Sequence, residues 1–146
     1  MTTILVLNGP NLGRLGTREP EVYGSETLEE IGAGLAASVP DGVEVDFRQS
    51  DDEAELIGWI HEAVDRRLPV VLNPAAFTHY SYALRDAAAQ LKQAGVPLVE
   101  VHLSNPHSRE TFRHTSVISG VATGVIAGFG PDSYHLAVQA VLRSLG

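Results

Sequence analysis

Residues 3–8, TILVLN, form an unbroken apolar run that decides the fold class. Successive apolar residues are typical of a strand covered on both faces, as in a parallel sheet. PVVLN at 69–73 and PLVEVHL at 97–103 repeat this pattern, whereas VEVDFRQ at 43–49 alternates like a strand near a sheet edge. With ATGVIAGFG at 122–130, the sequence predicts five strands.

Helical patterns separate these strands. SETLEEIGAGLAASV, beginning at residue 25, places Thr27 and Glu30 in the relation of a capping box. Three more apolar-periodic segments lie at 51–67, 80–95 and 132–145. Strict alternation with short connections predicts a single α/β domain over residues 1–146. We expect a flavodoxin-like three-layer sandwich with a five-stranded parallel sheet of order 2-1-3-4-5.

Composition excludes several classes of protein. The 146 residues carry a net charge of -8, which argues against a nucleic-acid-binding face. Cysteine is absent, which excludes disulfides, thiol catalysis and Cys-based zinc sites. No segment approaches the roughly 20 apolar residues of a membrane span. The first residues lack the basic region of a signal peptide, so we expect a cytoplasmic protein.

The loop after the first strand, NGPNLGRLGTREPEVYG at 8–24, lies where this fold binds ligands, at the switch point between strands 1 and 3. It lacks both the Lys-Ser/Thr pair of a phosphate-binding loop and GxGxxG spacing, which argues against nucleotide binding. Its length is typical of a functional lid with glycine hinges. A mobile loop whose Tyr packs on the body is the alternative.

A carboxylate and an imidazole share one face of the fourth strand. Glu100 and His102 are two residues apart, so their side chains point the same way near its carboxyl end. This pairing suits a general acid. The backbone N–H groups of Ser104 and Asn105, which follow, could hold a carboxylate.

The same segment allows two further interpretations. His102, His107 and His114 could bind a metal, although HxH and HxxxH spacings are missing. Arg109 and Arg113, four residues apart, would lie on one side of a helical turn and could cap an anion. Glu110 and Asp132 could instead neutralise these two side chains.

The loop after the third strand contains Asn73, which precedes Pro74 and therefore favours an extended conformation that aims its amide at the switch point. A purely structural Asn turn is the alternative. His79 lies in the same loop. Asp86, on the following helix, most simply pairs with Arg85, Lys92 or solvent.

Four stretches together resemble the type II 3-dehydroquinate dehydratase family: residues 8–24, RQSDDEAELIGWIHEA at 48–63, NPAAFTHYSYALRDA at 73–87 and VEVHLSNPHSRETFRHTSVISGVATGVIAG at 99–128. The likeness runs from Ile4 to about Gly130. It implies reversible dehydration of 3-dehydroquinate to 3-dehydroshikimate in the shikimate pathway, without metal, Schiff base or other cofactor. It also implies a homo-oligomer, a dodecamer built as a tetramer of trimers.

The resemblance assigns roles to five catalytic residues. Tyr23 resembles the base that removes a proton from C2, and Arg18 resembles the cation that stabilises the tyrosinate. Asn11 resembles the residue that positions a water against the enolate oxygen. His102 resembles the acid that protonates the leaving C1 hydroxyl, with Glu100 supporting it. A phenol with an ordinary pKa of about 10 is about 0.1% ionised at pH 7, so such a base requires a neighbouring cation.

The resemblance also assigns substrate contacts to seven residues: Asn73, His79, Asp86, Leu103, Ser104, Arg109 and Arg113. Asn73 and the backbone at Leu103 and Ser104 resemble a site for the substrate carboxylate. His79, Arg109 and Arg113 resemble contacts around the ring hydroxyls and the closed lid. Asp86 resembles a residue that reaches a neighbouring subunit's site.

Five positions depart from the family pattern. Ala75 and Ala76 stand where at least one Gly is common, and Tyr80 and Tyr82 replace smaller residues at the rim. Ser133 replaces a Gly, which we expect to affect the start of a helix. A non-catalytic binding domain of the same fold is the alternative function, although such a domain needs no acid-base pair.

Overall fold

The computed structural model describes residues 1–17, 21 and 25–146. Arg18 and Tyr23 lie outside the described residues. The five predicted strands form one sheet whose neighbouring strands are all parallel, in the order β2-β1-β3-β4-β5. Their bounds are β1 Thr2–Asn8, β2 Val43–Gln49, β3 Val70–Asn73, β4 Leu98–His102 and β5 Gly124–Ala127. The predicted fold class and strand order are confirmed.

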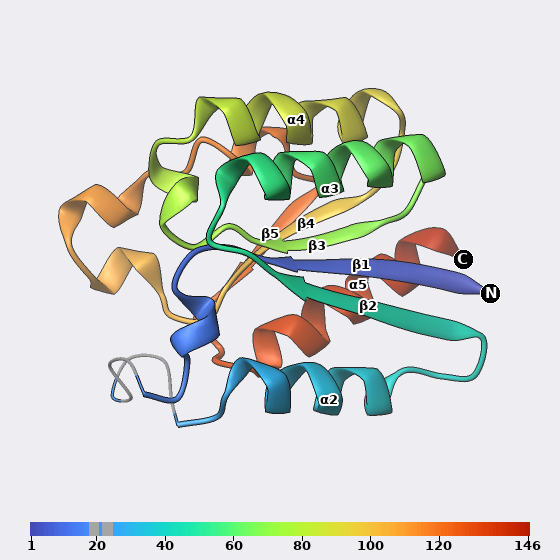
Figure 1. The fold of residues 1–146 in the computed structure, drawn as a ribbon, viewed down its shortest axis with the longest axis horizontal. Helices are drawn as coiled ribbons and strands as arrows, with labels where there is room; N and C mark the ends of the chain where they lie inside the picture. Colours follow the sequence, from blue (N-terminus) through green and yellow to red (C-terminus); the bar gives the residue numbers. More distant parts are fainter. Residues whose placement is uncertain (18–20, 22–24) are drawn as a thin grey trace.

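Two pairs of helices cover the sheet (Figure 1). Helices α2 (Leu28–Ser38) and α5 (Asp132–Leu145) lie on one face, and α3 (Glu53–Arg66) and α4 (Tyr82–Gln93) on the other. Ile4 and Val6 of β1 pack toward α2 and α5, whereas Leu5 and Leu7 join the core under α3 and α4. All four side chains are fully buried, which explains the unbroken apolar run.

Side-chain caps fix where three helices begin. The predicted capping box of α2 is present: Glu30 N–H donates to Thr27 Oγ1 over 3.1 Å, and Thr27 N–H donates to Glu30 Oε1 over 3.3 Å. Asp52 caps α3, and Ser81 caps α4. Each cap satisfies backbone N–H groups that have no partner inside the helix.

The carboxyl ends of the strands meet at the left of Figure 1, opposite the two chain termini. Short 3-10 helices follow three of these strands: η1 (Leu12–Arg14) after β1, η2 (Ala75–His79) after β3, and η3 (Pro106–Ser108) with η4 (Thr111–His114) after β4. A further one, η5 (Ser119–Val121), leads into β5. The 3-10 helices η1 to η4 therefore lie at the carboxyl end of the sheet.

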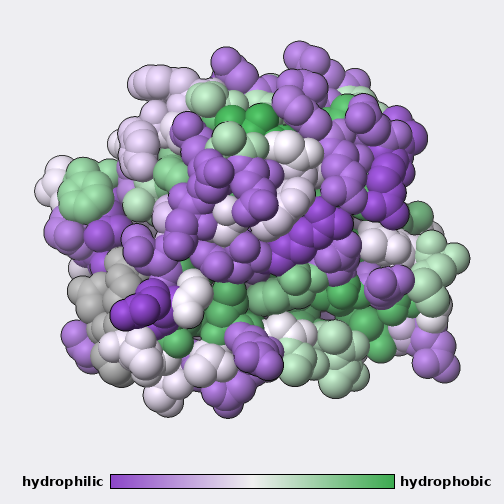
Figure 2. Space-filling view, in the orientation of Figure 1, coloured by the Kyte–Doolittle hydropathy of each residue, from purple (hydrophilic) through white to green (hydrophobic). Residues whose placement is uncertain are grey.

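The surface differs between the two layers (Figure 2). Polar side chains cover α3, whereas apolar groups show between the edge strand β2 and helix α2. Phe47 of β2 is only half-buried there, beside Gly32 of α2. Among the described residues, no helix is long and apolar enough to cross a membrane.

Candidate active site

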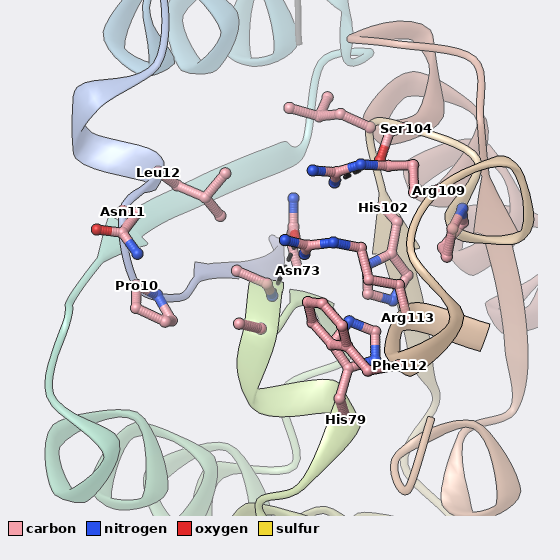
Figure 3. A pocket seen from close by; sticks show the side chains of 14 residues that line it. Pro10, Asn11, Leu12, Asn73, His79, His102, Ser104, Arg109, Phe112 and Arg113 are labelled. Carbon is pink, nitrogen blue, oxygen red and sulfur yellow. Dashed lines mark hydrogen bonds between the residues drawn. The ribbon is translucent and has the colours of Figure 1, made fainter. Parts of the chain in front are cut away.

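A cavity of about 270 Å³ lies at the carboxyl edge of the sheet, between the loops that follow β1, β3 and β4. It brings together eight residues that the sequence singled out: Asn11, Asn73, His79, His102, Leu103, Ser104, Arg109 and Arg113. Pro10, Asn11 and Leu12 form one wall, and His102, Arg109 and Arg113 face them across the cavity (Figure 3). Polar groups from three distant segments therefore converge on one ligand-sized space.

His102 and Glu100 form the hydrogen-bonded pair that their spacing on β4 suggested. His102 Nε2–H donates to Glu100 Oε2 over 2.5 Å, and the Glu100 side chain is fully buried behind it. The His102 side chain is 12% exposed and lines the cavity. Because Nε2 is engaged by the carboxylate, Nδ1 is the ring nitrogen that can meet a ligand.

Hydroxyl groups surround the Glu100 carboxylate. Thr78 Oγ1 donates to Oε2 over 2.6 Å, and Ser119 Oγ donates to Oε1 over 2.5 Å. Ser116 Oγ lies 3.0 Å from Oε2. Burial alone would raise the pKa of Glu100, but the hydrogen bond and charge of His102, with the Ser119 and Thr78 hydroxyls, lower it to about 2. Glu100 is therefore ionised at neutral pH.

Asn73 ends β3 with a fully defined amide orientation. Its Oδ1 accepts from Ala75 N–H over 3.1 Å, which is the structural Asn turn weighed for this position. Its Nδ2 donates to the hydroxyl of Tyr134 over 2.9 Å, and the amide also lines the cavity. Asn73 can therefore form the structural Asn turn and face the cavity at the same time.

Two guanidinium groups extend into the cavity (Figure 3), and both lie near the carboxylate of Glu110. Arg113 Nε donates to Glu110 Oε1 over 2.9 Å, and Arg109 Nη2 lies 3.9 Å from the same oxygen. Arg109 Nη1 also donates to Ser104 Oγ over 3.4 Å. The alternative counter-ion, Asp132, lies in the first turn of α5. Arg109 and Arg113 both bring N–H donors and positive charge to the cavity, which suits this wall to an anion.

His79 contributes a neutral imidazole to the same wall. Burial lowers its pKa most, the positive charges of His102 and Arg113 lower it further, and a hydrogen bond to the Thr115 carbonyl opposes them. His79 Nδ1–H donates to that carbonyl over 2.8 Å, which leaves Nε2 as an acceptor. The ring stands edge-on to Phe112, with centroids 5.7 Å apart.

Asn11 on the opposite wall is held through its backbone. Its φ of 69° is left-handed, and its N–H donates to Asp51 Oδ1 over 2.9 Å. Gln49 Nε2 donates to the same oxygen and to the Gly9 carbonyl. Asp51 and Gln49 thus tie the segment after β2 to the loop after β1.

Some sequence predictions fall elsewhere. Asp86 is exposed on α4, where Arg85 Nη1 donates to its Oδ1 over 2.9 Å, and it does not line the cavity of its own chain. Its role toward a neighbouring subunit stays a prediction. The rings of His107 and His114 lie 5.7 Å apart, but in the described part of the chain no group of three or more His, Asp or Glu could hold a metal ion.

The positions that depart from the family pattern have distinct environments. Ala75 and Ala76 line the cavity, and Ala75 has a left-handed φ of 51°. Tyr80 and Tyr82 are exposed. Ser133 is buried and its Oγ accepts from Phe129 N–H over 3.1 Å, which anchors the segment before α5.

Reasoning from the sequence did not find Ser116, Ser119, Asp51 or Tyr134. Ser116 and Ser119 contact Glu100 across 16 and 19 residues of chain, and Tyr134 contacts Asn73 across 61. Such contacts leave no periodic signal. Only the excess of small polar residues between 104 and 119 hinted at a polar cluster.

The chain is similar to known proteins over nearly its whole length. The sequence model of the family described as Dehydroquinase class II matches residues 2–142. A 3-dehydroquinate dehydratase of Kineococcus radiotolerans is 64% identical over 137 residues, which cover 93% of this chain and 92% of that protein. The 3-dehydroquinate dehydratase 2 of Pseudomonas aeruginosa is 56% identical over 138 residues, or 94% and 91%. A crystal structure of type II dehydroquinase from Propionibacterium acnes superimposes with a TM-score of 0.93 at 49% identity, over 98% and 97% of the two chains.

Proposed function

This chain belongs to the class II dehydroquinase family, and on that premise we propose that it is a 3-dehydroquinate dehydratase of the shikimate pathway. The reaction removes a proton from C2 and the hydroxyl from C1 of 3-dehydroquinate, through an enolate. It yields 3-dehydroshikimate and one water, and the reverse step adds that water. The chemistry is acid-base and requires no cofactor.

The observation that carries this proposal is the His102–Glu100 pair opening onto a cavity whose walls also present two arginines. A leaving hydroxyl needs a proton, and an imidazole held by an ionised carboxylate supplies one. His102 is the proposed acid, and Glu100 orients it. An anionic substrate with several hydroxyls fits the surrounding donors.

Four further side chains, with the backbone at Leu103 and Ser104, are proposed to bind the substrate. Asn73 and the backbone at Leu103 and Ser104 are proposed to bind its carboxylate, and all three residues line the cavity. Arg109 and Arg113 add positive charge and N–H donors to the same cavity. The neutral His79 presents an acceptor to a ring hydroxyl.

The base and its activator are proposed from the family likeness. Tyr23 takes the C2 proton and Arg18 stabilises the phenolate, and both lie outside the described residues. Asn11 positions a water against the enolate oxygen. Tyr23→Phe is expected to abolish turnover with substrate still bound, and Arg18→Ala to lower turnover far more than binding.

The proposal extends to assembly and location. We place the chain in a dodecamer built as a tetramer of trimers, in which the exposed Asp86 reaches the cavity of a neighbouring subunit. The location is cytoplasmic. Cell fractionation with an antibody to the chain tests the second statement.

Incubation with 3-dehydroquinate tests the activity directly, because the product is a conjugated enone whose ultraviolet absorbance reports each turnover. We expect the absorbance to rise in the presence or absence of EDTA. Binding of the substrate by calorimetry without any enone would instead indicate a non-catalytic binding domain. If EDTA abolished the activity and a metal ion restored it, the site would be shown to bind a metal ion.

A further inference from the structure

Tyr134 of α5 sends a buried hydroxyl to the carboxyl ends of two neighbouring strands. Its side chain is fully buried, with its ring 6.0 Å from the ring of Phe47. The hydroxyl lies 2.5 Å from Asn8 Oδ1 and 2.9 Å from Asn73 Nδ2. Asn8 and Asn73 are register partners at the ends of β1 and β3, the two strands of the switch point.

The donor and acceptor of each hydrogen bond among Asn8, Tyr134 and Asn73 follow from the chemistry of the groups. Asn8 Nδ2 donates to the Arg48 carbonyl over 2.9 Å, so Asn8 Oδ1 is the atom that faces Tyr134. An oxygen of this kind only accepts, so the Tyr134 hydroxyl donates to it. The hydroxyl then has a lone pair that accepts from Asn73 Nδ2. Burial raises the pKa of the Tyr134 hydroxyl, which keeps it protonated.

Asn73 is thereby held from both sides of its amide. Its Oδ1 accepts from Ala75 N–H, and one Nδ2 hydrogen is donated to Tyr134. The second Nδ2 hydrogen is then left for a ligand, because Asn73 lines the cavity. Reversal of the amide would set two donors against each other at Ala75 N–H, so only one orientation is stable.

We propose that Tyr134 is a positioning residue, which holds the Asn73 amide so that its remaining N–H donates to the substrate in the cavity. Tyr134 itself does not line the cavity and acts only through Asn73. The identity of this substrate as 3-dehydroquinate rests on the proposed function, whereas the orientation of Asn73 is independent of it.

The kinetic test is Tyr134→Phe, which removes one oxygen and keeps the ring. Asn73 loses the partner of one N–H, so we expect the KM for 3-dehydroquinate to rise about tenfold and kcat to fall less than about threefold, the scale of one weakened hydrogen bond. The matched control is Val141→Ala, which opens the same core further along α5. It is expected to lower the melting temperature and leave KM unchanged.

A second test reads the amide without turnover. Hydrogen exchange of the Asn73 side-chain amide, followed by NMR, should be at least about tenfold slower than that of the exposed Asn105 in the wild-type chain, and should accelerate in Tyr134→Phe. The exchange measurement tests whether Tyr134 positions Asn73 even if the wild-type protein does not convert 3-dehydroquinate. Lack of conversion would contradict the proposed function and not the role of Tyr134.

Three results overturn the assignment. The first is exchange of the wild-type Asn73 amide as fast as that of Asn105. The second is a folded Tyr134→Phe protein with unchanged KM and unchanged exchange. The third is a rise in KM of equal size in Val141→Ala, since KM would then follow general loss of stability. If Tyr134→Phe does not fold, the exchange rates of the Asn73 and Asn105 side-chain amides in the wild-type protein still test the assignment.

Discussion

Glu100 is a buried charge whose cost is offset by hydrogen bonds from four side chains. An unpaired carboxylate in this position would lose its hydration without replacement. His102, Thr78, Ser116 and Ser119 replace that hydration, and both carboxylate oxygens are used. The same bonds fix the plane of the carboxylate and, through it, the ring of His102.

The depressed pKa of Glu100 predicts acid sensitivity. Because its pKa in the folded state, about 2, lies below the usual 4.5, ionisation stabilises the fold above that usual value, and this gain is lost as the pH falls toward 2. The contribution is on the order of 3 kcal/mol. Glu100→Gln should therefore lose less stability than the wild type between pH 5 and about 2 in urea unfolding. Glu62, which also has a pKa of about 2, titrates in both proteins. The contribution of Glu100 is therefore measured as the difference in the free energy of unfolding between the wild type and Glu100→Gln. Parallel curves would contradict this account.

Ala75 is strained for a residue with a Cβ, at a φ of 51°. Glycine adopts this conformation freely, so a Gly at this position would carry no such strain. Ala75→Gly is expected to raise the free energy of unfolding by about 1 kcal/mol. The control is Ala76→Gly in the same turn, which should lower it by about 0.5–1 kcal/mol. Equal effects of the two changes would refute the strain at Ala75.

At the residue scale, the sequence predicted contacts that are local and missed those that are not. Alternation along a strand placed Glu100 and His102 on one face. The helical turn predicted to carry both Arg109 and Arg113 was wrong, since Arg109 is extended at the end of η3 and Arg113 lies in η4. The hydroxyls on Glu100 and the phenol on Asn73 come from segments up to 61 residues away. Their positions follow from packing, which no local pattern records.

At the scale of elements, the ends of β1 and β3 approach so closely that Gly9 is required. A Cβ at Gly9 would lie 2.6 Å from the Pro74 carbonyl oxygen, and Gly9 N–H donates to the Asn73 carbonyl over 2.8 Å. Both obstacles are backbone, which cannot turn aside as a side chain would. The close approach brings the loop of Asn11 beside that of Asn73.

Gly9→Ala is therefore expected to lower the free energy of unfolding by roughly 1–3 kcal/mol, the usual cost of overpacking. The matched control is Gly58→Ala in α3, where an added Cβ meets nothing within 4 Å. It should stabilise the protein by about 1 kcal/mol through helix propensity. Denaturant unfolding of both variants checks the pair, and a Gly9→Ala protein as stable as Gly58→Ala would disprove the contact.

Elements were more predictable than contacts, because apolar runs and caps are local signals. The buried strands β3 and β4 lie within their predicted ranges, and β1 begins at Thr2, one residue before its predicted range. Thr27 caps α2 as expected. After β4 the sequence predicted one helical turn, whereas the structure has two separate 3-10 helices, η3 and η4. The segment that follows these helices contacts the distant η2, where Val117 N–H donates to the Thr78 carbonyl over 2.7 Å.

At the scale of the whole molecule, the strand order places the cavity. The chain runs outward from β1 to β2 and then crosses to β3, so the loops after β1 and β3 diverge and leave a crevice. The order was predictable because strict alternation permits few topologies. The exposed apolar surface was harder to predict from the sequence, because its aromatic residues follow no periodic pattern along the chain. They are Tyr80, Tyr82, Phe112 and Phe129.

The exposed apolar side chains and the apolar strip between β2 and α2 in Figure 2 support assembly into an oligomer, because such surface favours subunit contact. Light scattering behind gel filtration is expected to give the mass of twelve chains. Dilution should not shift it in the micromolar range. A mass of one chain of 15.6 kDa would contradict the proposed assembly.

The central claim is that His102, held by Glu100, gives a proton to the leaving hydroxyl. Steady-state kinetics of His102→Asn with 3-dehydroquinate tests it most directly. The account predicts that kcat falls by about 10²–10⁴-fold, as expected for loss of a general acid, while KM changes little. A kcat within a few-fold of the wild-type value, in a folded protein, would contradict it.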